Sequence, residues 1–218
     1  MPENRKKVVI VTAASSGLGA GTARDLAARG WNVVLFARSE RVESMAGEIG
    51  GLAVRGDIAC EDDLAALVGT AIDTFGRIDD LVLSTGNPAK GGLHDLTRRD
   101  WHEGLCLALL PLVSLTRLLV PVFSRAGSGS IVTISSHAAT QPNVKFPISG
   151  PLRSRLEFYR MAAREDAHFG NRINPVMPGF IDNRAISEEW LARIPAGRYR
   201  TIDELTGVVE FLLSDASA

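Results

Sequence analysis

The stretch Val8–Gly30, VVIVTAASSGLGAGTARDLAARG, decides the fold because it joins a strand, a glycine turn and a helix. Its first four residues are a continuous β-branched run, which is typical of a strand buried on both faces of a parallel sheet. Gly17, Gly19 and Gly21 remove side chains where the backbone must turn sharply. The helix that follows presents unpaired N–H groups and a positive dipole end to an anion. The stretch therefore predicts a phosphate-binding turn.

The rest of the chain alternates strands with helices. Apolar runs bounded by turn residues predict strands, and amphipathic segments between them predict helices. Such alternation indicates a single α/β domain with a doubly wound parallel sheet. Pro111 predicts a kink in the longest apolar helix. The later expected strands cover 31–37, 52–56, 78–83, 130–136 and 172–177, and the expected helices cover 19–29, 40–49, 61–75, 101–123, 150–168, 185–193 and 202–214.

Charge and composition exclude several classes of protein. The net charge of the 218 residues is -1, and Lys and Arg are scattered, which argues against a nucleic-acid partner. We expect a soluble, cytoplasmic protein, because the N-terminus is polar and no span of 18 apolar residues occurs. Cys60 and Cys106 have no motif spacing and are expected to be buried small hydrophobic residues. The histidines lack metal-ligand spacing, so no metal is expected.

The end of the second strand indicates which nucleotide the turn would hold. In dinucleotide-binding folds, an acidic residue at this place binds the ribose of NAD, whereas an arginine accommodates the extra phosphate of NADP. Arg38 and Ser39 stand here, and no acid precedes them. A guanidinium offers a fork of donors to a phosphate. We therefore predict NADP(H), with NAD(H) as the less favoured alternative.

The glycine turn also carries a resemblance. Thr12, Gly17 and Gly19 have the spacing of the TGxxxGxG turn, so the chain resembles the short-chain dehydrogenase/reductase family, a single-domain relative of the Rossmann fold. The resemblance continues in family order through Asp57, Gly86, Pro178–Gly179 and the closing EFLLSDASA. Two positions depart from it. Ala13 stands where the family usually has glycine, and the fourth strand ends in LSTG where NNAG is usual.

The resemblance implies which residues bind the cofactor. Asp57 is expected to lie against the adenine ring, although it could equally cap the next helix. The helices near 101–123 and 151–168 are expected to build a homodimer or homotetramer, and a short substrate lid is expected at about 180–197. No seventh strand follows the last helix of the chain as given. The expected cofactor-binding residues are Thr12, Ala14, Ser15, Ser16, Gly17, Leu18, Gly19, Arg38, Ser39, Asp57, Ile58, Thr85, Gly86, Arg153, Pro178, Gly179 and Ile181.

The catalytic positions depart further from the family pattern. Members use a serine, a tyrosine thirteen residues later, a lysine four beyond it and an asparagine in the long helix. Counting from Ser136, the tyrosine position is Ser149 and the lysine position is Arg153. Alignment on Trp101 places Ala108 at the asparagine position. We expect Ser136, Ser149 and Arg153 to be the catalytic residues. A serine hydroxyl is far less acidic than a phenol and an arginine stays charged, so the proton donor must be altered.

Three functions are compatible with these features. We favour an NADP(H)-dependent oxidoreductase acting on a small carbonyl or alcohol. The reason is that the nucleotide half of the chain, around the glycine turn and Arg38, resembles the family more closely than the catalytic half, around Ser136 and Arg153, does. His137 could shuttle a proton, although a loop histidine is more often simply solvated. The alternatives are a nucleotide-binding protein with a regulatory or assembly role, and a non-redox lyase or isomerase on the same fold.

Overall fold

A single parallel sheet of six strands runs through the computed structural model, which describes residues 6–141, 143–183 and 186–217. The strand order is β3-β2-β1-β4-β5-β6. All strands are parallel, but the direction in which successive strands are added to the sheet reverses between β1 and β4, as in doubly wound dinucleotide-binding folds. The predicted fold class is therefore confirmed. The strands are β1 (Val8–Thr12), β2 (Asn32–Ala37), β3 (Leu52–Arg55), β4 (Asp80–Leu83), β5 (Gly129–Ile134) and β6 (Asn171–Val176).

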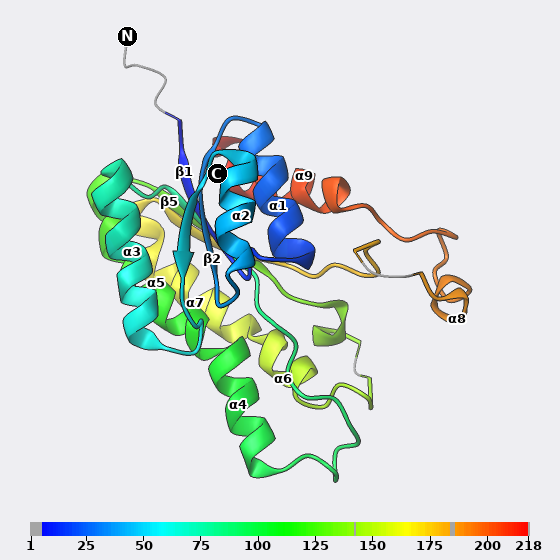
Figure 1. Ribbon diagram of the computed structural model, residues 1–218. Coiled ribbons are helices and arrows are strands. Elements are labelled where there is room, and N and C mark those ends of the chain that lie inside the picture. Colours follow the sequence, from blue (N-terminus) through cyan, green and yellow to red (C-terminus); the bar gives the residue numbers. More distant parts are fainter. Residues whose placement is uncertain (1–5, 142, 184–185, 218) are drawn as a thin grey trace.

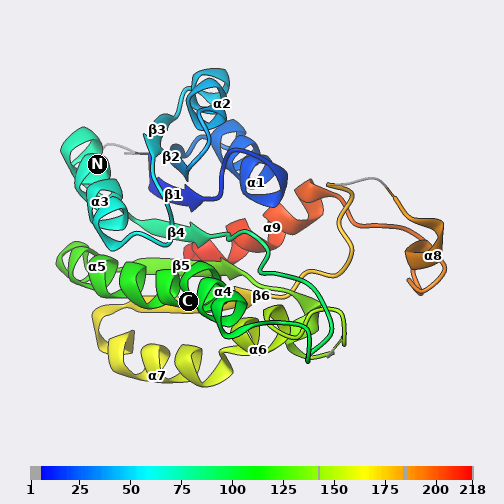
Figure 2. The same cartoon turned by 60° about the horizontal axis from the view of Figure 1, so that its bottom comes forward.

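Helices cover both faces of the sheet (Figures 1 and 2). One face carries α1 (Gly17–Ala28), α2 (Arg41–Ile49) and α9 (Ile202–Leu213). The other carries α3 (Glu61–Phe75), α5 (Leu110–Ala126) and α7 (Leu156–Asp166). Beyond the carboxyl ends of the strands lie α4 (Arg98–Ala108) and α6 (Ser149–Ser154), and α8 (Glu188–Leu191) stands apart from the sheet (Figure 1). Single 3-10 turns are η1 (His137–Ala139), η2 (Ala167–Phe169) and η3 (Asp215–Ser217).

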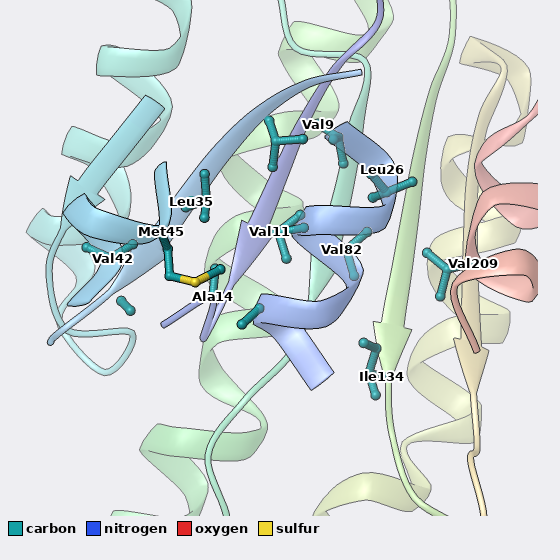
Figure 3. Packing of buried hydrophobic residues seen from close by; sticks show 14 of the residues in the cluster. Val9, Val11, Ala14, Leu26, Leu35, Val42, Met45, Val82, Ile134 and Val209 are labelled. Carbon is teal, nitrogen blue, oxygen red and sulfur yellow. The ribbon is translucent and has the colours of Figure 1, made fainter. Parts of the chain in front are cut away.

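The core has two layers because successive strand residues point to opposite faces. Val9 and Val11 of β1 pack with Leu26 and Val209 on the α1 and α9 side, as Figure 3 shows. Ile10 faces the α3 and α5 side. All residues of β1 are fully buried, as its unbroken apolar run predicts. The carboxyl ends of these rigid strands form the edge on which the glycine turn is placed.

Two of the expected helices are interrupted. The helix expected over 101–123 is two helices, which meet at Leu109, and Pro111 lies in the first turn of α5. The kink is therefore confirmed, but the helical segment begins earlier and ends later than expected. The helix expected over 150–168 breaks at Arg155, where α6 gives way to α7. The Arg155 guanidinium donates to the carbonyl of Ala108, so a single side chain joins the two interruptions.

The segment formed by α4 and α5 contains a long apolar span, although none is expected from the sequence. Residues 98–126 are long and apolar enough to cross a membrane, with a mean hydropathy of 2.1 in one 18-residue window. This is the one such segment in the part of the chain that the structure describes. The interruption at Leu109 divides it, and Leu112, Leu115, Leu119 and Phe123 of α5 are fully buried against the sheet. Only 28% of the apolar window is buried, so one side of α5 packs on the sheet while the rest stays exposed, and the expectation that no long apolar span occurs is wrong.

Several local expectations are corrected. Cys60 and Cys106 are free but only partly buried. The residue that caps α3 is Cys60 and not Asp57, whose carboxylate instead accepts from the backbone N–H of Ala59 at 2.9 Å. The lid helix expected over 185–193 is the single turn α8, and the first residue of that expected range, Ala185, lies outside the described residues.

Candidate active site

The glycine turn is closed tightly on the first turn of α1. Gly17 has a φ of +60°, which favours glycine, and a Cβ on Gly19 would lie 2.5 Å from the carbonyl oxygen of Ala13. Ser16, the N-cap, makes no side-chain cap, and no acid lies in the first turn. The N–H groups of this turn are therefore left for an anion, which fits the phosphates of a dinucleotide.

Ala13 is held in a strained conformation. Its φ is +50°, and among the described non-glycine residues it alone has a positive φ. The left-handed region costs an L-residue about 1 kcal/mol. The glycine that the resemblance implies at this position would adopt this conformation without strain, whereas alanine adopts it at a cost in stability.

Three buried residues, Thr12, Ala14 and Leu18, anchor the glycine turn to the sheet and the core. The Thr12 hydroxyl is fully buried, donates to the Ser84 carbonyl at 2.6 Å and accepts from the Ser84 N–H at 3.0 Å. Ala14 is also fully buried, and its N–H donates to the Phe36 carbonyl at 3.1 Å. Leu18 packs against the core under α1. These three predicted residues therefore fix β1 and the turn, and their side chains do not line the cleft.

A cleft of about 410 Å³ lies beside the turn. It brings together the predicted residues Ser15, Ser16, Arg38, Ser39, Ile58 and Gly86. Phe36, Gly56 and Leu107 also line it and were missed, because nothing in an apolar or glycine residue distinguishes a cleft wall from a core position. A Cβ on Gly86 would lie 3.4 Å from the Leu107 side chain, so a glycine at this position keeps the wall close to α4.

Arg38 stands at the mouth of this cleft. Its side chain is 73% exposed, and its Nη1 lies 3.5 Å from Oδ2 of Asp57. An exposed pair of this kind contributes little to stability, so the guanidinium can turn to a ligand at small cost. Asp57, which the resemblance predicts to contact the adenine ring, therefore lies beside Arg38 without fixing it.

The segment after β6 crosses over the glycine turn. The position of a Cβ on Gly17 lies 3.5 Å from Nδ2 of Asn183, a residue that sequence reasoning missed. Ile181 forms a bridge with Arg200 and packs on the core. Pro178 and Gly179, predicted to bind cofactor, lead the chain from β6 toward this crossing, and the Pro178 carbonyl accepts from the His137 N–H at 3.2 Å.

Arg153 is the centre of the catalytic half. It is 5% exposed, and it joins the ends of β4 and β5 to α6. Burial and the neighbouring Arg155 lower the pKa of Arg153 to about 10, so it remains charged at neutral pH. No described carboxylate pairs with it, and its partners are all neutral. The guanidinium donates to Ser149 Oγ at 3.1 Å, to the Ile134 carbonyl at 3.3 Å, to Thr85 Oγ1 at 3.1 Å and to the Gly86 carbonyl at 2.8 Å.

Each of the two serines predicted to be catalytic accepts one hydrogen bond from the protein. Ser149 Oγ accepts from Nε of Arg153, and Ser136 Oγ accepts from the Ala138 N–H at 3.2 Å. Each hydroxyl hydrogen is then free to point elsewhere, because a hydroxyl has one donor beside its acceptor lone pairs. The two serines lie on elements in direct contact, since a Cβ on Gly150 would lie 3.3 Å from the Ala138 carbonyl.

The comparisons agree with this geometry. The family described as enoyl-(acyl carrier protein) reductase matches residues 12–218. The chain belongs to the short-chain dehydrogenase/reductase family. A cis-4-hydroxycyclohexanecarboxylate dehydrogenase from Sinomonas cyclohexanicum is 33% identical over 228 residues, which cover 98% of this chain and 91% of that protein. A 3-oxoacyl-(acyl-carrier-protein) reductase from Synechocystis sp. is 32% identical over 224 residues, which cover 97% of this chain and 91% of that one.

Two solved structures have the same fold as this chain. The crystal structure of a 3-ketoacyl-(acyl-carrier-protein) reductase from Brucella melitensis complexed with NADH superimposes with a TM-score of 0.91 at 26% identity, and the match covers 97% of this chain and 92% of that chain. A short chain dehydrogenase from Bacillus anthracis gives a TM-score of 0.90 at 26% identity, with 97% and 90% covered. The named relatives are reductases and dehydrogenases, so this short-chain dehydrogenase/reductase is an oxidoreductase.

Tyr159 and His137 carry two further ring groups in this part of this short-chain dehydrogenase/reductase. Tyr159 is 5% exposed, and its hydroxyl lies 2.7 Å from Oγ1 of Thr133, inside the core. Tyr159 therefore packs in the core and does not face the cleft. The half-buried ring of His137 lies 5.5 Å from the ring of Phe180. No group of three or more potential metal ligands occurs among the residues that the structure describes.

Proposed function

We propose that the protein is an NADP(H)-dependent oxidoreductase that acts on a small carbonyl or alcohol. The observation that carries this proposal is the mouth of the cleft, where Arg38 and Ser39 follow β2 without an acid. The uncapped first turn of α1 supports it as the place for the phosphates. A guanidinium and a hydroxyl suit the extra phosphate of NADP, whereas NAD is favoured by a carboxylate.

Each catalytic residue has a defined task in this proposal. A bound nicotinamide would supply or accept a hydride. Ser136 and Ser149 would donate hydrogen bonds to the oxygen of the carbonyl, because each accepts a bond from the protein and keeps its own hydroxyl hydrogen for a ligand. Arg153 would hold a fixed positive charge behind Ser149 and keep it oriented. None of these groups releases a proton near neutral pH, so the proton donor differs from that of a tyrosine enzyme.

The names of the relatives support the substrate class but leave the cofactor open. One relative is named for the oxidation of a ring alcohol and another for the reduction of a 3-oxoacyl group. Both reactions join a ketone to a secondary alcohol. The Brucella melitensis structure, however, is a complex with NADH. The preference for NADP(H) therefore depends on Arg38 and not on the family.

Calorimetric titration with NADPH and NADH tests the proposal. We expect NADPH to bind about 30-fold more tightly than NADH, and Arg38→Asp to reverse the preference, because a charge-assisted hydrogen bond contributes about 2 kcal/mol. Arg125→Asp is the matched control, since it makes the same charge change at the exposed last turn of α5. Equal binding of both nucleotides that Arg38→Asp leaves unchanged would contradict the NADP assignment.

Turnover then separates the enzyme from a nucleotide-binding regulator. The replaced tyrosine and lysine positions, Ser149 and Arg153, favour this second candidate. Oxidation of NADPH with any member of a carbonyl panel supports the enzyme. Tight binding without turnover of any carbonyl or alcohol would instead support the regulatory or assembly role.

We further propose a cytoplasmic homodimer or homotetramer. Leu110 and Val113 on α5 are 42% and 41% exposed, and Met161 on α7 is 60% exposed, so these helices offer apolar surface to a second copy. Light scattering at micromolar concentration tests this, and a monomer would contradict it.

A further inference from the structure

A small cavity lies under α5 and α7, on the face of the sheet that these helices cover, and it shares no lining residue with the cleft beside the glycine turn. Its volume is about 10 Å³, which is about the free volume that one water molecule needs. Most of its wall is apolar and comes from four elements, α5, β5, α7 and β6. The apolar side chains are Val120, Phe123, Ile131, Ala162 and Ile173.

Three buried polar atoms complete this wall. They are the hydroxyl oxygen of Thr116 in α5 and both the oxygen and the nitrogen of the Asn171 amide in β6, and none has a hydrogen-bond partner among the described residues. Asn171 is only 8% exposed, so bulk solvent does not satisfy its amide. A buried amide or hydroxyl without a partner costs free energy, and native proteins leave few of them. The two side chains therefore point to a ligand that lies between them.

The register of the sheet explains why the Asn171 amide faces α5. Asn171 pairs with Gly129 across β5 and β6, and a Cβ on Gly129 would overlap the Phe123 ring of α5, so this row of the sheet faces that helix. Arg172 also borders the cavity, but its guanidinium donates to the Leu212 carbonyl of α9 on the opposite face. Among the described lining residues, no charged group therefore points into the cavity. A neutral dipole fits this site better than an ion does.

We propose that Thr116 and Asn171 form a binding site for one water molecule, which joins α5 to β6 inside the protein. The oxygen and nitrogen of a primary amide lie side by side, so the water accepts from Nδ2 and donates one hydrogen to Oδ1. Its second hydrogen is directed to the Thr116 hydroxyl. About three hydrogen bonds is the usual number for a buried water, and the volume leaves no room for a larger ligand. This site lies outside the cleft and goes beyond the proposed function.

The water has a structural task because of where β6 lies. β6 is the last strand of the sheet, and β5 is its one neighbour among the described strands. It leads into the segment that crosses the glycine turn at Asn183. A hydrogen-bonded link from α5 holds the beginning of this edge strand where strand pairing alone comes from one side. Loss of the water should therefore loosen β6 before it loosens the centre of the sheet.

A high-resolution crystal structure tests the site directly. We expect one peak of density about 2.7–3.2 Å from the Thr116 hydroxyl and from both polar atoms of the Asn171 amide. In solution, the side-chain amide protons of Asn171 should show nuclear Overhauser effects to water with the sign of a molecule that tumbles with the protein. Thr116→Ser keeps the hydroxyl and should keep both signals, whereas Asn171→Leu should lose the density. A direct hydrogen bond between Thr116 and Asn171, with no water between them, would overturn the site.

Paired substitutions test whether the two side chains share one ligand. Thr116→Val and Asn171→Leu each remove bonds to the water, and we expect each to lower the melting temperature by about 3 °C. The double variant should be no less stable than Asn171→Leu, because a cavity with apolar walls throughout needs no water. Thr74→Val, at an exposed position of α3, is the matched control and should leave the melting temperature unchanged. Losses that simply add in the double variant would overturn the shared water.

Hydrogen exchange tests the link to β6. In Thr116→Val, we expect the backbone amides of β6 to exchange at least threefold faster relative to those of β2, which pairs with strands on both sides. Thr116→Ser should leave this ratio as in the wild-type protein. An unchanged ratio in a folded Thr116→Val protein would show that no water holds β6 to α5, and it would overturn the inference.

Discussion

The nucleotide half and the catalytic half of the molecule are built by different means. Around β1, the turn depends on the main chain: a positive φ at Gly17, close backbone contact at Gly19 and uncapped N–H groups at the start of α1. Around β4 and β5, the site depends on the side chains of Arg153 and Ser149. A main-chain site tolerates replacement of many side chains, whereas a side-chain site changes its chemistry with each replacement. The two halves are therefore expected to respond differently to substitution.

Gly19→Ala should give the largest effect on stability and NADPH affinity, because it changes the backbone of the glycine turn. The added Cβ would meet the Ala13 carbonyl oxygen at 2.5 Å and the Thr12 carbonyl oxygen at 2.7 Å, so the turn must open. We expect a loss of about 3 kcal/mol in the free energy of unfolding and of at least 100-fold in NADPH affinity. Urea unfolding and calorimetry measure both. Gly47→Ala in α2 is the control, because its Cβ would meet nothing within 4 Å, and wild-type behaviour of both variants would refute this view of the turn.

Arg153→Met should affect the catalytic half alone. It removes the hydrogen bonds to Ile134, Thr85 and Gly86, while it also removes a buried charge. We expect a net destabilisation of about 2 kcal/mol and a fall of at least 100-fold in kcat/KM. Denaturant unfolding and steady-state kinetics check these values. Full activity in a folded Arg153→Met protein would show that the charge has no part in the reaction.

Asp80 lies where the two halves join, since β4 pairs with β1 at Val9 and Asp80. Burial raises the pKa of Asp80 from 3.8 to about 8, so the folded protein holds a proton that the unfolded chain releases. The contribution of Asp80 to stability is therefore greatest below pH 4 and declines as the pH rises toward 8. Asp80→Asn should remove this decline and gain at least about 1 kcal/mol relative to wild type between pH 6 and 8. Parallel pH profiles for the two proteins would disprove the buried proton.

Ala13→Gly should give the smallest effect. Glycine adopts a φ of +50° without the steric cost that alanine bears. We expect the melting temperature to rise by a few degrees, which corresponds to about 1 kcal/mol, and NADPH affinity to change by no more than threefold. Differential scanning calorimetry measures the first. A lower melting temperature would mean that the methyl group contributes packing that outweighs the strain.

The sequence predicts the fold well because the buried strands carry their own signal. Every strand of the sheet was located within two residues at each end, and Gly76 and Gly127 end helices in the left-handed conformation expected of glycine. The interruptions at Leu109 and Arg155 could be predicted only in part. Pro111 marks the first, whereas the second depends on a tertiary contact from Arg155 to Ala108 that no local pattern encodes.

The candidate site was predictable where the backbone determines it. Ser15, Ser16 and Arg38 line the cleft as their places in the sequence predict. The burial of Arg153 could not be predicted from composition, because arginine is rarely buried and its acceptors come from distant strands. Asn183 was missed for a similar reason, since its segment reaches the glycine turn only through the folded chain.

The separation of the two halves is tested most directly by one pair of titrations: NADPH affinity measured by calorimetry for Arg38→Asp and for Arg153→Met. We predict that Arg38→Asp weakens NADPH about 30-fold. Although the resemblance also implies a cofactor contact for Arg153, we predict that Arg153→Met changes the affinity by less than threefold, because four of the five guanidinium donors are bonded to the protein. A loss of affinity in Arg153→Met equal to that in Arg38→Asp would mean that the buried guanidinium belongs to the nucleotide site, and it would contradict the division on which this account rests.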